Sequence, residues 1–320
     1  SALPLHLRKI LVPELSKRLL AYGDAESAST ALRSLERAPK GLSADANLAK
    51  ADVELAQKKI EKAQDRLAEI VTSNTEQSAA ALIKFVDSHL AEDSEIDDNV
   101  ATHVEAYALE MRNEPLEVEL RRTHVLALGK SGQFSAAFDA LNRMRARNIE
   151  LEEDTLRSSI LDLLTRNSDD VKFLHHAFKQ IEIAPESLTP ISRFQLAKRL
   201  TDMGFFEQAK VVLESGLGYS DQETVALLRA EIYLSLEKPA EALAHLFGLD
   251  SERASRLRAR AEASAGDFSS AHEIYSELGN GTETQSMAWL SQDWLDRVDD
   301  ETPVFGQMVS VAQIALEAQV

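Results

Sequence analysis

The sequence of 320 residues predicts an all-α fold, a solenoid of about eight helical hairpins. A short pattern returns about every 35 residues: an apolar helix, a Gly or polar break, an aromatic or branched residue two places on, then Ala, then Leu or Tyr. Repetition at a fixed period in a helical sequence indicates stacked helix pairs. The chain has only 12 Gly and 8 Pro, and Ala, Leu, Glu, Arg and Lys are common. We therefore expect helices over roughly 60% of the residues or more and no β-sheet.

The small Ala of each second helix sets the spacing of the repeats. It recurs at Ala28, Ala63, Ala137, Ala209, Ala242 and Ala271. The gaps between them are 35, 74, 72, 33 and 29 residues, so each of the two long gaps should contain one degenerate repeat. We expect Ala209, Ala242 and Ala271 to be buried between the two helices of their own hairpins, because a small side chain lets two helices approach closely.

In chain order, the repeats fill residues 1–320 as one continuous array. Degenerate repeats occupy 12–72, 75–113 and 152–181, the clearest repeats lie at 118–147 and 190–280, and the helices of 282–320 cap the C-terminal end. The helices expected in the two long gaps are Ser78–Leu90, Asp97–Met111, Glu152–Arg166 and Asp169–Ile181. Trp289 and Trp294 fall on one helix of the cap, where they either pack the last helix pair or form a partner-binding patch.

Local signals mark where the helices begin and end. Pro4 and Pro13 stand where a helix can begin, since a first-turn Pro lacks only an amide that has no helical partner. The candidate N-caps are Ser43, Asp97, Ser187 or Thr189, and Asp221. The residues expected to separate the two helices of a hairpin are Gly23, Gly132, Gly204 and Gly266.

The clearest repeat resembles the tetratricopeptide repeat family. The matching residues are Leu196, Ala197, Leu200, Gly204, Phe206, Ala209 and Leu213. Matches to the next two units are Ala230, Tyr233, Ala242 and Leu246, then Ala259, Gly266, Phe268, Ala271 and Tyr275. The resemblance implies a right-handed superhelix whose concave surface is lined by the first helix of each hairpin. The Trp and Pro typical of the family are mostly missing, so a looser helical-hairpin solenoid stays open for the N-terminal half.

The charge of the chain limits its partners. It carries 53 acidic and 35 basic residues, a formal net charge of −18. This argues against general binding to nucleic acid or to an anionic membrane, both of which need basic surface. No stretch approaches the roughly 20 apolar residues of a membrane span. Because the chain begins with Ser and has no Cys, a bacterial periplasm after removal of a signal peptide is slightly preferred over the cytoplasm.

No motif in the sequence predicts catalysis or a cofactor. Without Cys, disulfides and thiolate ligands are excluded. None of the eight His has the spacing of a tight metal site. We therefore predict no cofactor, no metal and no enzymatic activity.

A group of basic residues is the candidate partner-binding site. Arg253, Arg256 and Arg260 have i, i+3, i+7 spacing and share one face of a first helix. By the resemblance, the concave surface would carry these three together with Lys198, Arg122 and Lys130. Arginine binds carboxylates through two hydrogen bonds, which favours an acidic or C-terminal protein segment as the partner. In the alternative, the arginines pair with Glu252, Glu262 and neighbouring acids.

The predicted function is therefore a non-enzymatic scaffold that binds a protein or peptide on its concave surface. Two alternatives stay open. The chain could be an accessory helical domain of a larger enzyme, or an enzyme whose site the sequence does not reveal. It could also be a structural module that associates with itself.

Overall fold

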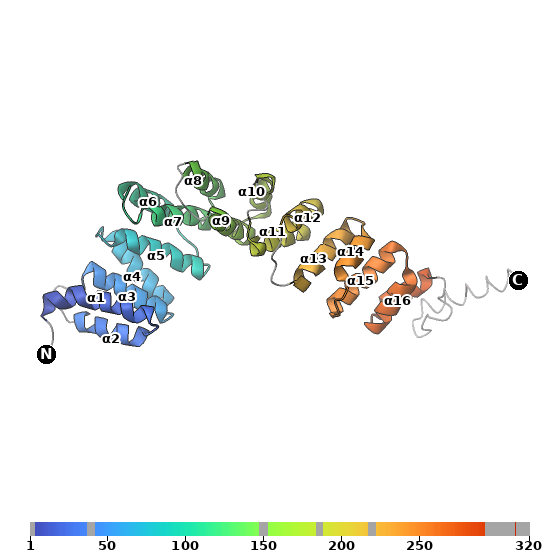
Figure 1. Cartoon of the computed structure of the whole chain (residues 1–320), viewed down its shortest axis with the longest axis horizontal. Helices are drawn as coiled ribbons and strands as arrows, with labels where there is room; N and C mark the ends of the chain where they lie inside the picture. The colour runs from blue at the N-terminus through green and yellow to red at the C-terminus, as the bar shows by residue number, and fades with distance from the viewer. Residues whose placement is uncertain are drawn as a thin grey trace. The chain divides into compact units, whose positions relative to one another are not determined.

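The computed structural model describes residues 4–36, 42–146, 153–183, 188–216, 222–291 and residue 311. Within these ranges 81% of the residues are helical, in seventeen helices, and there is no strand (Figure 1). The chain divides into two compact units, Ser1–His176 and Ala177–Val320. The all-α class is confirmed. That the repeats form one continuous right-handed superhelix over 1–320 stays a prediction.

Unit 1, residues 1–176, contains nine helices in its described residues and the start of a tenth. They are α1 Leu5–Ala21, α2 Ala25–Glu36, α3 Ala44–Ala56, α4 Ile60–Thr72, α5 Ser78–Ala91, α6 Asp98–Glu110, α7 Glu117–Lys130, α8 Phe134–Ala146, α9 Glu153–Asn167 and α10 Asp170–Ile183. The helices expected in the two long gaps are thus present, as α5, α6, α9 and α10. The pairing differs from a regular hairpin at α5–α6, since α6 packs more extensively on α7 than on α5.

Unit 2, residues 177–320, contains the remainder of α10 and seven further helices in its described residues. They are α11 Pro190–Asp202, α12 Phe206–Glu214, α13 Gln222–Ser235, α14 Pro239–Leu246, α15 Glu252–Ala265, α16 Phe268–Glu277 and α17 Gly281–Leu290. Pairs α11–α12, α13–α14 and α15–α16 pack as hairpins, and α17 packs on α16. Trp289 on α17 is half-buried, whereas Trp294 lies outside the described residues.

The turn inside each hairpin except α9–α10 contains one residue in the left-handed backbone conformation, which we call the turn residue. Gly266 ends α15 with φ 87°, and its N–H donates to the carbonyl of Ala263. Glycine adopts this conformation without steric cost. In the hairpins α3–α4 and α13–α14 the turn residues are Lys58 and Glu237, with φ of 57° and 58°. The turn residue therefore gives the other first helices a common reference point.

The small Ala residues lie where the repeat pattern predicts. Ala209, Ala242 and Ala271 are each completely buried, on the second helices α12, α14 and α16. The same is true of Ala28, Ala63 and Ala137 in unit 1. The predicted register of these hairpins is confirmed.

Most of the predicted helix ends are confirmed, and one is wrong. The side chains of Ser43, Asp97 and Thr189 each accept a hydrogen bond from a backbone N–H in the first turn of the helix that follows. Ser187 and Asp221 lie outside the described residues. Pro4 precedes α1 as expected, but Pro13 does not begin a helix: it is buried inside α1. A proline there removes one helical hydrogen bond, and α1 continues through it because α1 packs along α2 and α3.

The first helices of successive hairpins form one layer within each unit. In unit 1, α1 packs on α3, α5 on α7, and α7 on α9; in unit 2, α11 packs on α13 and α13 on α15. Gly129 of α7 approaches α9 so closely that an added Cβ would lie 3.2 Å from Leu163 Cδ1. We call the exposed side of this layer the first-helix face. It corresponds to the surface that the sequence assigned to partner binding.

Candidate binding surfaces

One position recurs on the first-helix face, six residues before the turn residue of each hairpin. In α3, α5 and α13 it holds an acid, in α1, α11 and α15 it holds a base, and in α7 it holds Leu126. The acids are Asp52, Asp87 and Glu231, and the bases are Lys17, Lys198 and Arg260. We call this the minus-six position.

The acids at the minus-six position each pair with a base from the next first helix. Asp52 Oδ1 lies 2.7 Å from Lys84 Nζ, and Asp87 Oδ1 lies 3.7 Å from a guanidinium nitrogen of Arg122. In unit 2, Glu231 Oε2 lies 3.4 Å from a guanidinium nitrogen of Arg253. Within the described residues, the acid belongs to the earlier helix and the base to the later one in all three pairs.

Two of the predicted binding residues lie in unit 1. Arg122 is half-exposed, and its guanidinium also lies 3.6 Å from Glu119. Lys130 has little surface for a partner, since its side chain is only 3% exposed and its ammonium group donates to Asp93. This hydrogen bond, followed by that from Asn167, holds the pKa of Asp93 below its usual value. Lys130 therefore stabilises the end of α7, a role that its sequence position does not reveal.

The other predicted residues lie in unit 2 and are exposed. The side chain of Arg253 is 64% exposed. Arg256 is 53% exposed, and its guanidinium lies 2.8 Å from Glu252 Oε1, one turn away on α15. Arg260 and Lys198, at the minus-six position, are exposed, and neither has an ion pair within the described residues. Arg253 and Arg256 thus do pair with acids, as the alternative predicted, and their partners Glu231 and Glu252 are 39% and 74% exposed.

Arg258 belongs to a different side of α15. Its guanidinium donates to the carbonyl oxygens of Leu246, at 3.1 Å, and Leu249, at 2.7 Å. These carbonyls lie at the C-terminal end of α14, where helical partners are absent and a cation is favourable. Arg258 therefore joins α15 to the preceding helix.

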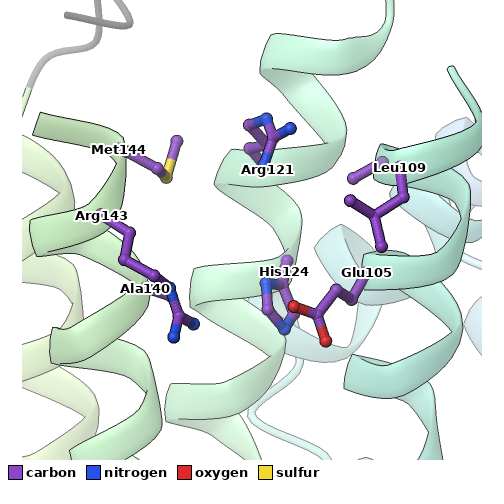
Figure 2. Close-up of a pocket in the computed structure, with 8 residues that line it drawn as sticks. Glu105, Leu109, Arg121, His124, Ala140, Arg143 and Met144 are labelled. Carbon is purple, nitrogen blue, oxygen red and sulfur yellow. The ribbon is translucent and has the colours of Figure 1, made fainter. Parts of the chain in front are cut away.

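A pocket of about 250 Å³ opens between α6 and α8 above α7, on a side that sequence reasoning did not consider (Figure 2). Its apolar walls are Ala108, Leu109, Ala140 and Met144, and its polar side chains are Glu105, Arg121, His124 and Arg143. In Figure 2, His124 and Arg121 stand on the middle helix, with Glu105 on one side and Arg143 on the other.

The charged groups of the pocket differ in how far they are already engaged. Arg121 donates to Glu117 at 2.8 Å, so its charge is compensated within α7. Arg143 is exposed and has no ion pair within the described residues. Burial lowers the pKa of His124, an effect that Glu105 opposes and that Arg143 and Arg121 reinforce. His124 is therefore neutral at pH 7, and Arg143 is the cation of the pocket with no acid bound to it.

A second polar cluster occupies the corresponding side of unit 2. The Tyr233 hydroxyl donates to Glu214, and its ring stacks on His245 with ring centroids 5.3 Å apart. Lys210 Nζ lies 5.6 Å from the centre of the same ring. The hydrogen bond to Glu214 is the largest cause that raises the pKa of Tyr233, to about 12. These contacts join α12, α13 and α14, so the cluster connects neighbouring hairpins.

Two further properties are seen in the described residues. No group of three or more His, Asp and Glu side chains there could hold a metal ion. No helix there is long and apolar enough to cross a membrane.

Comparison with known proteins adds little to this picture. No family model matches the sequence, and no curated protein matches it. A search of solved structures finds similarity to the crystal structure of a tetratricopeptide repeat protein from Parabacteroides merdae. The two are 11% identical with a TM-score of 0.40, and the match covers 89% of this chain and 98% of that one. Because the identity and the TM-score are low, the fold assignment depends on the chain's own helices and turns and not on this similarity.

Proposed function

We propose that this chain is a protein-binding scaffold that holds acidic protein segments on the first-helix face of unit 2. The observation that supports the proposal is the arginine stripe, Arg253, Arg256 and Arg260, exposed on α15 in a chain of net charge −18. The net negative charge of the chain repels acidic surfaces, whereas the positive patch attracts their carboxylates. The patch therefore selects and orients a partner.

The existing ion pairs of the stripe present little obstacle to such a partner. Glu231 and Glu252, which pair with Arg253 and Arg256, are 39% and 74% exposed. Exposed pairs of this kind contribute about 0–1 kcal/mol each. A partner carboxylate can replace them at small cost, and Arg260 has no pair to break within the described residues. Lys198 holds the minus-six position of α11 and is a second exposed base on this face, with Glu231 of α13 at the same position between α11 and α15.

The test uses a fluorescein-labelled peptide of alternating Glu and Leu, with a Gln and Leu peptide as the uncharged reference. Fluorescence anisotropy is measured with the intact chain and with the triple variant Arg253→Gln, Arg256→Gln, Arg260→Gln. We expect the variant to bind at least about tenfold more weakly. Binding to the intact chain should weaken as salt rises, because exposed charges are screened over about 8–10 Å.

A charge-matched variant serves as the control. Arg33→Gln, Arg112→Gln and Lys172→Gln remove three exposed basic residues from unit 1. This control should bind the acidic peptide with unchanged affinity. Equal binding by the stripe variant and the control, with normal circular dichroism of both, would contradict the proposal.

A further inference from the structure

A comparison inside the chain explains why the pocket between α6 and α8 exists. His124 stands eight residues before the turn residue Gly132, and Arg258 stands eight residues before Gly266. In unit 2, the long side chain of Arg258 reaches the end of α14 and donates to two carbonyls there. In unit 1, the shorter His124 faces α6 and leaves space beside Ala108 and Leu109. The same register position thus holds an arginine that reaches the preceding helix in unit 2 and a shorter histidine that lines the pocket in unit 1.

The size of the pocket limits its ligand. Pockets for drug-sized ligands and cofactors measure about 300–1,000 Å³, whereas this one measures about 250 Å³. It can accept one branched aliphatic group with one polar group, not a nucleotide. Leu109, of which 59% is exposed, and the buried Met144 supply apolar contact on opposite sides.

The polar groups of the pocket indicate the charge of the ligand. Arg143, Arg121 and His124 all carry N–H donors, and Glu105 alone provides a carboxylate. Arg121 is already bound to Glu117, which leaves the Arg143 guanidinium as the group that can bind an anion. A guanidinium binds a carboxylate through two parallel hydrogen bonds, which is stronger than a neutral contact.

We propose that the pocket lined by Leu109, Met144 and Arg143 binds a small aliphatic carboxylate, with the carboxylate on Arg143 and the aliphatic group between Leu109 and Met144. This site lies in unit 1 and is independent of the arginine stripe. The same chemistry is found in a free branched-chain acid and in an aliphatic residue next to a carboxylate in a peptide.

Three probes that share a 3-methylbutyl chain test the charge. They are 4-methylpentanoate, its amide 4-methylpentanamide, and the cation isopentylamine. Binding is followed by NMR, from the ring signals of His124 and the methyl signal of Met144 in the intact chain. We expect 4-methylpentanoate to bind with a Kd on the order of millimolar, as fits a ligand of this size, and the amide and amine to bind at least about tenfold more weakly. Equal binding of acid and amide, or stronger binding of the amine, would overturn the proposal.

Variants test the roles of single residues. Arg143→Gln should weaken binding of 4-methylpentanoate about tenfold, while Arg145→Gln, on the same helix but outside the pocket, should leave it unchanged. Glu105→Gln should strengthen binding, because it removes a negative charge beside the ligand carboxylate. Weaker binding by Glu105→Gln would show that a cation occupies the pocket and would overturn the assignment.

The variant His124→Arg places in α7 the side chain that stands at the same register position of α15. With unchanged circular dichroism, it should abolish the response of the Met144 methyl signal to 4-methylpentanoate. A retained response would show that the acid binds elsewhere. N-acetyl-leucine then distinguishes a peptide ligand from a free acid. If it binds more tightly than 4-methylpentanoate, the ligand is a peptide. If the two bind equally, the ligand is a free branched-chain acid.

Two cross-controls test whether the pocket and the arginine stripe bind independently. Arg143→Gln should leave the anisotropy of the Glu and Leu peptide on the arginine stripe unchanged. The triple stripe variant, in turn, should leave the NMR response to 4-methylpentanoate unchanged.

Discussion

The first-helix faces of the two units use the same kinds of side chain differently. In unit 1 the minus-six residues Asp52 and Asp87 are acids, and each pairs with a base from the next first helix. In unit 2 the minus-six residues of α11 and α15 are the exposed bases Lys198 and Arg260. The acids Asp52 and Asp87 are thus already paired, whereas the bases Lys198 and Arg260 are available to a partner.

The largest expected effect concerns a buried ion pair of unit 1. Glu54 on α3 binds Arg66 on α4 through two hydrogen bonds, of 2.8 and 3.0 Å, and the two side chains are 5% and 17% exposed. Glu54→Ala leaves the Arg66 charge in a largely buried place. It should lower the free energy of unfolding by about 3 kcal/mol, measured by urea denaturation.

The matched control for this variant is Glu61→Ala, at an exposed position of α4. It should change the free energy of unfolding by less than about 0.5 kcal/mol. Equal effects of the two variants would mean that the buried ion pair of Glu54 and Arg66 does not stabilise unit 1.

A somewhat smaller loss of stability is expected from overpacking a buried Ala, which is a feature of the hairpins in both units. Ala209 is completely buried on α12. Ala209→Leu should overpack the hairpin α11–α12 and cost roughly 1–3 kcal/mol. Val211→Leu, at a half-exposed position of the same helix, is the control. An unchanged urea midpoint and slope for Ala209→Leu would show that the two units do not share one packing register.

The pair of Lys130 and Asp93 predicts a dependence on pH. The folded pKa of Asp93 is lowered, first by its hydrogen bond from Lys130. Its stabilising effect is therefore complete above the unfolded pKa of about 3.9 and is lost as pH falls through the lower folded pKa. Asp93→Asn should cost about 1 kcal/mol at neutral pH. The difference from the unsubstituted chain should shrink in acid, and a difference that grew on acidification would have the wrong sign.

The smallest effect on stability is expected in unit 2. Arg253→Gln and Arg256→Gln each remove one exposed ion pair and should change the free energy of unfolding by less than about 0.5 kcal/mol. Thermal denaturation of the two single variants measures this. A loss of about 2 kcal/mol or more would place these arginines with Lys130 as structural residues and remove them from the binding surface.

The sequence predicted the helices better than it predicted the roles of charged residues. Helix periodicity, Gly at the turns and small Ala residues act locally, so the pattern around Gly204 and Ala209 predicted α11 and α12 correctly. Pro13 was misplaced because the packing of α1 on α2 and α3 outweighs a local signal. Propensity describes the isolated helix, and tertiary contacts decide such cases.

In the candidate site, too, the sequence predicted local features better than contacts between distant residues. The i, i+3, i+7 spacing puts Arg253, Arg256 and Arg260 on one face of α15, which is a helix over Glu252–Ala265. It could not show that Lys130 is buried against Asp93, since the two are 37 residues apart and meet only in the folded chain. Nor could it show the pocket, which depends on the length of one side chain, His124, relative to the arginine at the same place in α15.

The difference between the first-helix faces of the two units is tested most directly by hydrogen–deuterium exchange with the Glu and Leu peptide bound at saturating concentration. The account predicts slower amide exchange in 252–265, which is α15, and in 190–202, which is α11. It predicts no change in 117–130, which is α7, although that helix carries Arg122 and Lys130. Slower exchange in 117–130 with none in 252–265 would contradict the assignment of the binding surface to unit 2.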